Sequence, residues 1–579
     1  MLYKHLATKN TPETTMQKKR PLTKSTRYLI ALWIILIILH YAGSVWRDTP
    51  LIIADEIGYL ANARYLAGVS QMPSMRFMAF YHFGYSLFII PALWLTSDLS
   101  LMYKTVMLIN SLLISSLFFA LYMILRELTE IQKGHAMAIA FVSCLYPSFL
   151  IQAYFAWSEN AFIPVFAFMV LGFIHLLKKK NISMGIVWGF SVGFLYTIHG
   201  RALSVIAVAL IYLMVLGIMK KLPKLTVCCS MATVISVYLL TIFVNRHLLT
   251  AGWLHSGFDI LKYLSQLASV KGIKNFFSVG MAQCLYLSLA TYGLFILGLF
   301  YVIKSTKQTI LNRSKTAQIK LHTFILLLGT SAGIFTTSCL GTLSDMPAEL
   351  FRISLFLHGR YNDGFVALFL MIGLYVLVFP EKSISNNRTR LWFPLLVISI
   401  FSLLPLWHDC FRTATPAFPL IDIAGIYPMV NLVGSINKLP IISLYFILCI
   451  LFMHFVFKYS FRIGIVTIAS YFILFYLSNF NWVMSAQENQ SQVQEAFETI
   501  RHGNHIRHLS YDMAYYQPAG FCFYQYLLPE ISFNMFNSKK GTHPLSEFVL
   551  SGNTTKTDYP GRFLLGENRY GHSLWYIGN

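Results

Sequence analysis

Apolar runs about as long as a membrane is thick recur along almost the whole chain, as far as residue 482. A helix needs roughly 20 predominantly apolar residues to cross the hydrocarbon core of a bilayer. Only 12% of the 579 residues are charged, whereas soluble globular proteins have about 25%. A water-soluble enzyme of this size is therefore excluded, and the sequence predicts an all-α polytopic membrane protein.

The apolar runs predict about 13 transmembrane helices. They lie at 28–46, 101–125, 136–157, 160–177, 184–199, 202–219, 225–248, 283–303, 322–342, 363–380, 391–407, 441–457 and 464–482. A further apolar stretch, 83–97, is interpreted as an interfacial or re-entrant helix. Counting it as a crossing would invert every later loop and place the basic clusters outside.

Lys and Arg gather in alternate loops, which predicts the orientation of the chain. With the N-terminus in the cytoplasm, the tail 1–27 and the other cytoplasmic segments hold 25 of the 45 Lys and Arg, but four of the 23 Asp and Glu. The net charge of +22 is then mainly a topogenic signal. A nucleic-acid partner is not expected.

Three parts follow from this topology. They are a cytoplasmic tail (1–27), a transmembrane domain (28–482) whose first outer loop is 47–100, and an extracytoplasmic C-terminal region (483–579). The sequence pattern of the C-terminal region predicts a small α/β domain. It has a polar helix near 488–502, a helix after Pro518, and strands near 505–511, 531–536, 548–551 and 574–577. Cys410 and Cys522 both lie outside, and spacing alone leaves their pairing open.

The first outer loop contains the residues most typical of a catalytic site. Asp55 and Glu56 stand about nine residues after the first span, at the head of an apparent amphipathic helix that also carries Tyr59. Two carboxylates beside a membrane face are costly to desolvate, which a function would explain. The alternative is a structural one, because acidic residues also favour a helix N-terminus.

Farther along the loop, Tyr81-His82-Phe83-Gly84-Tyr85 leads into an apolar helix. This order of a span, Asp-Glu, a Tyr-containing helix and an aromatic-Gly-Tyr stretch resembles the GT-C superfamily of membrane glycosyltransferases. That superfamily includes the protein O-mannosyltransferases, the lipid A aminoarabinose transferase and the catalytic subunit of oligosaccharyltransferase. The resemblance implies the GT-C fold, often with a C-terminal outer domain.

The resemblance also implies roles for acidic residues. Asp55 takes the place of the catalytic base, with Glu56 beside it, and Glu159 matches a second acidic residue that orients the acceptor or holds a metal. A polar residue in a turn at the water interface is the alternative for Glu159. No cofactor is required by the sequence, and a divalent metal cation joining the three carboxylates is left open because related enzymes differ.

The resemblance further implies a donor whose sugar is carried on a polyprenyl phosphate. Such a lipid-phosphate donor needs cations at the outer face, preferably Arg, whose planar fork suits phosphate oxygens. Two outer segments each contain an arginine that follows a histidine, and three further residues are weaker candidates. The donor-phosphate candidates are Arg201 with His199, Arg360 with His358, and then Arg64, Arg76 and His82. For each Arg the alternative is snorkelling to lipid headgroups. Tyr59 and Trp157 are the candidates for stacking on a sugar.

The resulting hypothesis is an inverting glycosyltransferase that moves a sugar from a polyprenyl (undecaprenyl) phosphate to a cell-envelope glycan or glycolipid. Its active site would lie on the periplasmic face of the inner membrane. A transporter or flippase of lipid-linked saccharides is the first alternative, although no carboxylate lies deep in a predicted span. An O-antigen ligase or polymerase is the second alternative, and a non-enzymatic receptor the third.

Overall fold

The computed structural model describes the chain from residue 23 to 576. Within these limits it leaves out 51–53, 70–80, 250–264, 266, 311, 313, 345–356, 358, 380–393, 401–422, 434–437, 503–506, 516–530, 553–561 and 566–572. Cys410 and Cys522 lie outside the described residues, as do the predicted helix after Pro518 and most of the predicted span 391–407.

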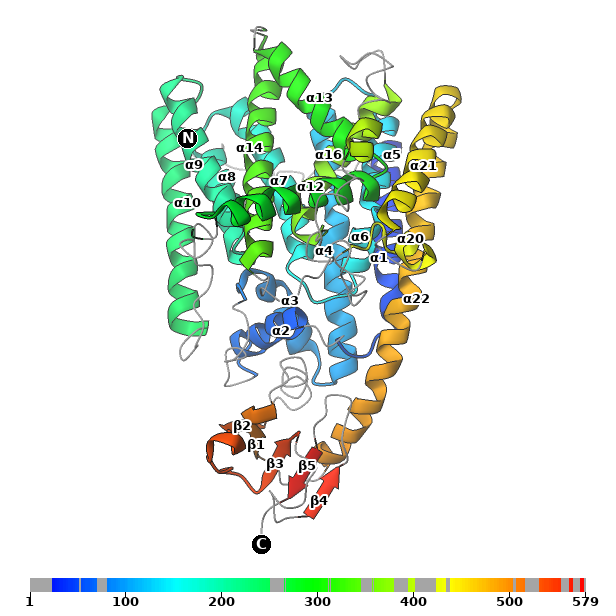
Figure 1. Cartoon of the computed structure of the whole chain (residues 1–579). Helices are drawn as coiled ribbons and strands as arrows, with labels where there is room; N and C mark the ends of the chain where they lie inside the picture. The colour runs from blue at the N-terminus through cyan, green and yellow to red at the C-terminus, as the bar shows by residue number, and fades with distance from the viewer. Residues whose placement is uncertain are drawn as a thin grey trace, which may run out of the picture.

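The described helices form a long bundle that ends, at one extreme, in a small β-sheet (Figure 1). The first half contains α1 (Lys24–Tyr41), η1 (Ala42–Trp46), α2 (Ala54–Leu66), α3 (Gly84–Leu95), α4 (Leu99–Leu128), α5 (Lys133–Cys144), α6 (Pro147–Gln152), α7 (Glu159–Lys179), α8 (Ile182–Ile198), α9 (Ala202–Ile218), α10 (Lys224–Val244) and η2 (Asn245–Leu249). The second half contains α12 (Val270–Ala290), α13 (Leu294–Thr309), α14 (Lys315–Ser344), η3 (Arg360–Asn362), α16 (Asp363–Val378), α20 (Tyr427–Val433), α21 (Leu439–Tyr459) and α22 (Phe461–His502).

Eight helices among the described residues are long and apolar enough to cross a membrane, or nine if α12 and α13 count as one broken span. The chain is thus a multi-pass membrane protein, but the predicted number of thirteen crossings is not confirmed. α8 and α9 are apolar but only 17 residues long. The predicted span 136–157 is divided into α5 and α6, because Pro147 begins a new helix there.

The predicted span 283–303 is also not a single straight helix. α12 and α13 meet at an angle of 109°. The two residues between which the chain turns, Tyr292 and Gly293, have φ angles of 52° and 76°, in the left-handed region that ends a right-handed helix. A hydropathy pattern does not register backbone handedness, so the sequence indicated one apolar run where the chain turns.

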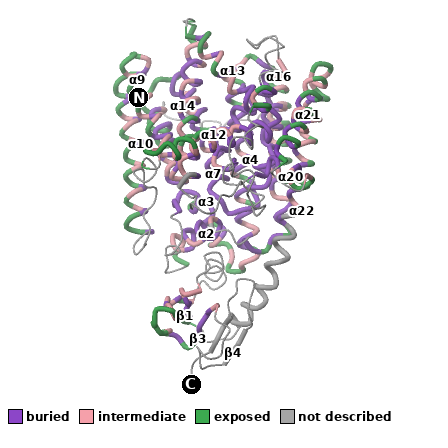
Figure 2. The backbone as a smooth tube through the Cα atoms, viewed as in Figure 1, coloured by how far each residue is buried: buried purple, intermediate pink, exposed green. Residues whose placement is uncertain are grey.

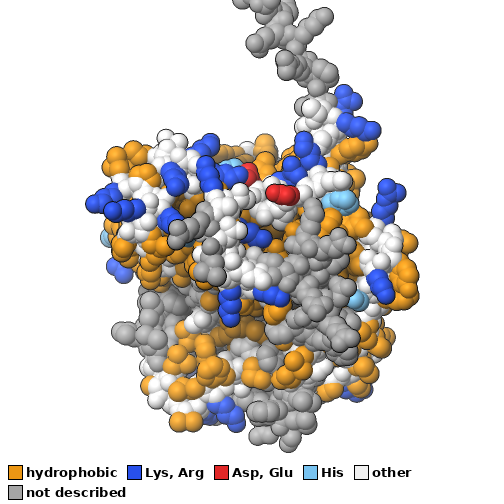
Figure 3. All heavy atoms as spheres, turned by 90° about the horizontal axis from the view of Figure 1, so that it is seen from above, with side chains coloured by type: hydrophobic (Ala, Val, Ile, Leu, Met, Phe, Trp, Pro, Cys, Tyr) orange, Lys and Arg blue, Asp and Glu red, His pale blue; other side chains and the backbone are white. Residues whose placement is uncertain are grey.

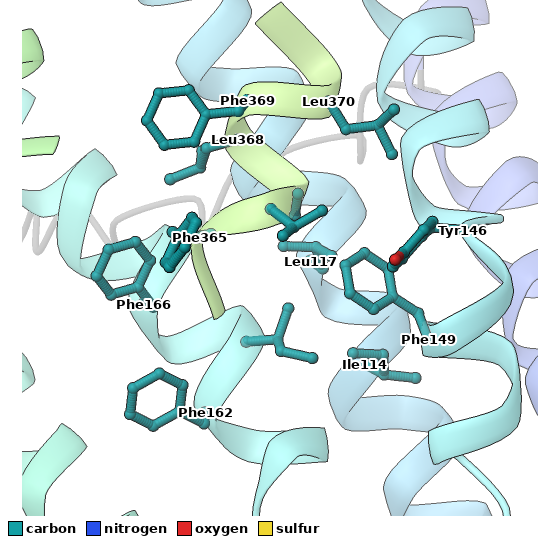
Figure 4. Close-up of a cluster of buried hydrophobic side chains, with 14 of the residues drawn as sticks. Ile114, Leu117, Tyr146, Phe149, Phe162, Phe166, Phe365, Leu368, Phe369 and Leu370 are labelled. Carbon is teal, nitrogen blue, oxygen red and sulfur yellow. The ribbon is translucent and has the colours of Figure 1, made fainter. Parts of the chain in front are cut away.

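The core of the bundle lies between α4, α6, α7 and α16, whose inner faces are buried (Figure 2). Figure 4 shows Phe162 of α7, Phe365 of α16 and Phe149 of α6 in one apolar cluster with Ile114 and Leu117 of α4. α13 and α16 touch backbone to backbone. A Cβ on Gly298 would lie 2.0 Å from the carbonyl oxygen of Phe369, so only glycine permits this approach.

The two ends of the bundle differ in composition. The end away from the sheet carries exposed lysines, including Lys178, Lys220 and Lys315, and Figure 3 shows that its Lys and Arg side chains far outnumber its Asp and Glu. At the other end, α2 and α3 lie between the bundle and the sheet (Figure 1). α3 has 12 residues, which at about 1.5 Å per residue is too short to cross a bilayer.

The C-terminal sheet has the strand order β2-β1-β3-β5-β4. Its strands are β1 (His508–Asp512), β2 (Ser532–Phe536), β3 (Phe548–Ser551), β4 (Arg562–Leu565) and β5 (Ser573–Tyr576). β1 pairs in parallel with β2 and β3, whereas β5 runs antiparallel to β3 and β4. β4 was not predicted from the sequence. The predicted polar helix 488–502 is the end of α22, which continues unbroken from the bundle.

Candidate active site

Asp55 lies in the first turn of α2, where the helix dipole favours a negative charge. Its Oδ2 accepts a hydrogen bond from Nη2 of Arg360 at 2.6 Å, and its Oδ1 accepts one from the hydroxyl of Tyr81 at 3.1 Å. The Asp55 side chain is 30% exposed, whereas that of Arg360 is 8% exposed. Asp55 is therefore an oriented carboxylate that a solute can still reach.

Glu159 is the first residue of α7 and is almost fully buried. Its Oε1 accepts a hydrogen bond from Nη2 of Arg201 at 3.2 Å and lies 3.7 Å from Nε of Arg360. Arg201 stands at the N-terminus of α9, with its guanidinium 4.5 Å from the ring centre of Phe162. Glu159 thus links two arginines that come from separate parts of the sequence.

Arg360 opens the short turn η3 immediately before α16. Its guanidinium lies 4.2 Å from the ring centre of Trp157 and 5.4 Å from that of Tyr361, so aromatic faces hold its plane. The turn itself is held by α12: Nδ2 of Asn362 donates to Oε1 of Gln283 at 2.9 Å. Arg360 is consequently a fixed cation in contact with both Asp55 and Glu159.

The structure thus brings together four of the predicted site residues: Asp55, Glu159, Arg201 and Arg360. Two carboxylates face two guanidinium groups, so the charges of the cluster balance. Nε and Nη1 of Arg201 are buried and have no hydrogen-bond partner among the described residues. Buried N–H groups without a partner are costly, and these are suited to receive an anionic ligand.

Glu56 points elsewhere, which corrects the expectation that it acts beside Asp55. It is fully buried, and its Oε1 accepts hydrogen bonds from the Tyr103 hydroxyl at 2.5 Å and the Ala156 backbone N–H at 2.9 Å. Its Oε2 lies 3.8 Å from Nη2 of the buried Arg47. Successive residues of a helix point about 100° apart, so Asp55 faces the site while Glu56 ties α2 to α4 and to the turn before α7.

The two histidines lie beside the site and shape the turn that carries Arg201. Nδ1 of His199 accepts a hydrogen bond from the backbone N–H of Arg201 at 3.2 Å. Burial, and then the Arg201 charge, lower the pKa of His199 well below its usual value. His82 packs under Gly200, with its ring 4.9 Å from that of Tyr196. Burial lowers the pKa of His82 to about 4, so both rings are neutral at pH 7.

The other predicted phosphate-binding residues are Arg64, Arg76 and His358, of which the structure describes Arg64 alone. Arg64 lies in the last turn of α2, and about 1.5 Å per residue places its backbone roughly 13 Å along the helix from Asp55. Arg76 and His358 lie outside the described residues.

The two residues predicted to stack on a sugar are buried in protein contacts. Trp157 is 1% exposed, stacks on Phe155 at 4.5 Å and covers Arg360. Tyr59 is 5% exposed and packs edge-on against Tyr81 and Tyr85. Burial, and then the Glu159 charge, raise the pKa of Tyr59. Neither ring presents a face to a ligand, so the stacking prediction is wrong for this conformation.

Sequence reasoning missed Tyr81 and Tyr361 as members of the site. Tyr81 donates to Asp55, and Tyr361 lies against Arg201 as well as Arg360, with its ring centre 5.5 Å from the Arg201 guanidinium. Both belong to segments that the sequence singled out for other residues, next to His82 and to Arg360. In the sequence, Tyr81 stands next to His82 and Tyr361 next to Arg360, and this proximity to a candidate residue was the signal that could have identified them.

A metal site is not formed by these side chains. Within the part of the chain that the structure describes, no group of three or more His, Cys, Asp or Glu could hold a metal ion. The two carboxylates of the cluster are in contact with guanidinium groups instead.

The fold is similar to that of ArnT from Cupriavidus metallidurans. Over 96% of its length the chain superposes on 99% of ArnT from Cupriavidus metallidurans in the apo state, with a TM-score of 0.54 and 11% sequence identity. The structure of the same protein bound to undecaprenyl phosphate matches with a TM-score of 0.53, again at 11% identity, over 96% of this chain and 98% of ArnT.

A weaker match is arabinosyltransferase EmbB from Mycobacterium smegmatis, at 11% identity and a TM-score of 0.43, over 82% of this chain and 42% of EmbB. No family model matches the sequence, and no curated protein matches it by sequence. The similarity to ArnT therefore establishes the fold of the chain.

Proposed function

We propose that the protein is an inverting glycosyltransferase that takes a sugar from a polyprenyl phosphate and transfers it to a hydroxyl group of an extracytoplasmic acceptor. The observation that carries the proposal is the contact of Asp55 with Arg360, in a cluster that also contains Glu159 and Arg201, on an ArnT-like fold. ArnT has been solved with undecaprenyl phosphate bound, which supports a donor of that class.

Arg201 and Arg360 are the proposed ligands of the donor phosphate. Arg201 has two buried N–H groups without a partner among the described residues, and a guanidinium matches the geometry of phosphate oxygens. Arg201 also stands at the N-terminus of α9, whose dipole adds a partial positive charge. His199, neutral and bonded to the Arg201 backbone, positions that arginine and does not add charge.

Asp55 is the proposed general base. Its carboxylate takes the proton of the acceptor hydroxyl as the oxygen attacks the anomeric carbon, and the bond from that carbon to the phosphate oxygen breaks. The electron pair of this bond leaves with the lipid phosphate, whose negative charge the two arginines stabilise. A single displacement of this kind inverts the anomeric configuration.

Glu159 is proposed to hold the arginines and not to react itself. Its side chain is 3% exposed, against 30% for Asp55, and its Oε1 contacts both guanidinium groups. The proposed acceptor is a cell-envelope glycan or glycolipid, and the proposed location is the periplasmic face of the inner membrane. α2, which carries Asp55, and the C-terminal sheet lie toward the end of the bundle opposite the one whose Lys and Arg side chains Figure 3 shows (Figures 1 and 3), which supports this side.

The test uses purified protein in proteoliposomes with polyprenyl-phosphate sugars as donors and an envelope glycolipid fraction as acceptor. Asp55→Asn should reduce transfer at least about 100-fold, because a positioned base contributes that much or more. Glu130→Gln, which neutralises an exposed carboxylate at the far end of the bundle, is the matched control and should transfer at the wild-type rate. Full activity in Asp55→Asn would reject the assignment, and activity that depends on Arg360 alone would favour a ligase or polymerase.

A further inference from the structure

Arg360 occupies the position between the two carboxylates of the site. Its Nη2 lies 2.6 Å from Oδ2 of Asp55, and its Nε lies 3.7 Å from Oε1 of Glu159. We infer that Arg360 is the built-in cation that joins these carboxylates, in the place that a divalent metal would take, and that this protein transfers its sugar without a metal. The inference rests on the proposed function and specifies the electrostatics of the same site.

The carboxylate oxygens do not fit a metal as they stand. A divalent ion coordinates oxygen atoms at about 2.0 to 2.6 Å, which is the space that the Arg360 guanidinium fills beside Asp55. Glu159 is also bonded to Arg201 at 3.2 Å, so an ion there would lie beside two positive charges. Like charges repel strongly where burial excludes water, and the Arg360, Arg201 and Glu159 side chains are all less than one tenth exposed.

The residue that would complete a three-carboxylate site is turned away. Glu56 faces Tyr103, the Ala156 N–H and Arg47. His199, two residues before Arg201, uses its Nδ1 to accept a hydrogen bond from the Arg201 backbone N–H. The Glu56 carboxylate and His199 Nδ1 thus make contacts that hold the fold.

The position of Arg360 is enforced from several sides. Trp157 and Tyr361 cover its guanidinium. Behind it, Tyr286 of α12 packs so closely on Gly359 that a Cβ there would lie 1.7 Å from the Tyr286 ring. A cation held in this way needs no reorganisation when charge develops on the leaving phosphate, which is the property that a bound metal supplies elsewhere.

The inference is tested by titrating the purified full-length protein with Mn²⁺ and following free Mn²⁺ by electron paramagnetic resonance. Wild-type protein and Asp55→Asn should bind the same small amount of Mn²⁺, because no ion sits on Asp55. Arg360→Ala should gain one Mn²⁺ per protein, because Asp55 and Glu159 then lose the cation that joins them and only Arg201 remains beside Glu159. The double variant Arg360→Ala/Asp55→Asn should lose this gain.

Arg462→Ala removes an exposed arginine at the far end of the bundle and is the matched control, which should gain no Mn²⁺. Size-exclusion profiles verify that each variant is folded. If Arg360→Ala does not fold, the comparison of wild type with Asp55→Asn decides by itself. Two results would overturn the inference. One is that the wild type binds one Mn²⁺ per protein and Asp55→Asn does not. The other is that Arg360→Ala folds but binds no additional Mn²⁺.

The activity readout separates this inference from the proposed function. The rate of sugar transfer by the wild type should be unchanged after EDTA treatment. If EDTA abolishes transfer and Mn²⁺ restores it, the inference is overturned, but the proposed glycosyltransferase function is not. If the protein shows the expected Mn²⁺ binding but transfers no sugar from any polyprenyl donor, the proposed function is rejected. The role of Arg360 as the built-in cation is then unaffected.

Discussion

Arg360 and Asp55 form an ion pair of 2.6 Å across a separation of 305 residues. One partner opens a turn before α16 and the other opens α2. The pair unites the two segments that sequence reasoning had marked independently, one as acidic and one as basic.

Arg360→Lys tests whether the shape of the guanidinium is needed as well as its charge. Lysine keeps the charge but lacks the planar fork that contacts Asp55 and Glu159 together. We expect kcat/KM for the lipid-phosphate donor to fall about 10- to 100-fold, equivalent to about 1.4 to 2.7 kcal/mol. Arg462→Lys, at the far end of the bundle, should not change it. An unaltered kcat/KM in Arg360→Lys would contradict the proposed bridging contact.

Glu56→Gln should mainly affect stability. It leaves the buried Arg47 without its countercharge, and breaking a buried ion pair by removing one partner costs about 3 to 5 kcal/mol. We expect a lower thermal midpoint in detergent but a kcat per folded molecule within a few-fold of wild type. The added change Arg47→Met should recover part of the midpoint. A folded Glu56→Gln with kcat as low as that of Asp55→Asn would place Glu56 back among the reacting groups.

Glu56 and Asp55 also show where sequence reasoning stops. The Asp-Glu pair in the first outer loop was recognisable, and α2 does begin there. Which carboxylate faces the site depends on Tyr103, 47 residues later, and on the Ala156 N–H, 100 residues later. Such long-range partners leave no trace in the spacing of the motif, so the two acids were not distinguished.

The membrane segments likewise include some features that the sequence predicts and others that it does not. Spans such as α4 and α7 follow from composition alone, because a long apolar run has one stable arrangement in lipid. The bend at Tyr292 and Gly293 does not, since it depends on left-handed backbone angles within a continuous apolar run. The burial of Trp157 was likewise missed, because an aromatic residue near an acid suits protein packing as well as a sugar face.

Gly359→Ala should displace the turn that carries Arg360. A methyl group there would lie 1.7 Å from the Tyr286 ring, so the turn or the ring has to move. We expect at least about a 10-fold loss of transfer, partly recovered by adding Tyr286→Ala, which removes the ring.

Gly341→Ala provides the matched control for that change. Gly341 is in α14, and a Cβ there meets nothing within 4 Å. Alanine in a helix interior is favoured over glycine by up to about 1 kcal/mol, so activity should be retained and the thermal midpoint should stay or rise. Wild-type transfer in Gly359→Ala would show that close packing on Tyr286 does not position Arg360.

His82 should make the protein less stable in acid. Its pKa in the folded protein is about 4, lowered by burial, against about 6.5 when unfolded. The unfolded chain therefore binds more protons between these values, and stability falls as the pH falls from about 6.5 toward 4, by about 2 kcal/mol at pH 5.

His82→Gln should flatten this dependence, which the difference between thermal midpoints at pH 7 and pH 5 measures. His135→Gln, at the far end of the bundle beside Phe461, serves as the histidine control and should keep the wild-type difference. An equal acid loss in His82→Gln would show that the buried ring is not its source.

Single-turnover transfer from prebound donor tests the central claim, that Asp55 is the base, most directly. Wild type and Asp55→Asn are loaded with the same radiolabelled polyprenyl-phosphate sugar, the bound amount is measured, and excess acceptor is added. We predict comparable loading, because the proposed phosphate ligands are Arg201 and Arg360, with the transfer step slowed at least about 100-fold in Asp55→Asn. Equal single-turnover rates in the two proteins would contradict the claim.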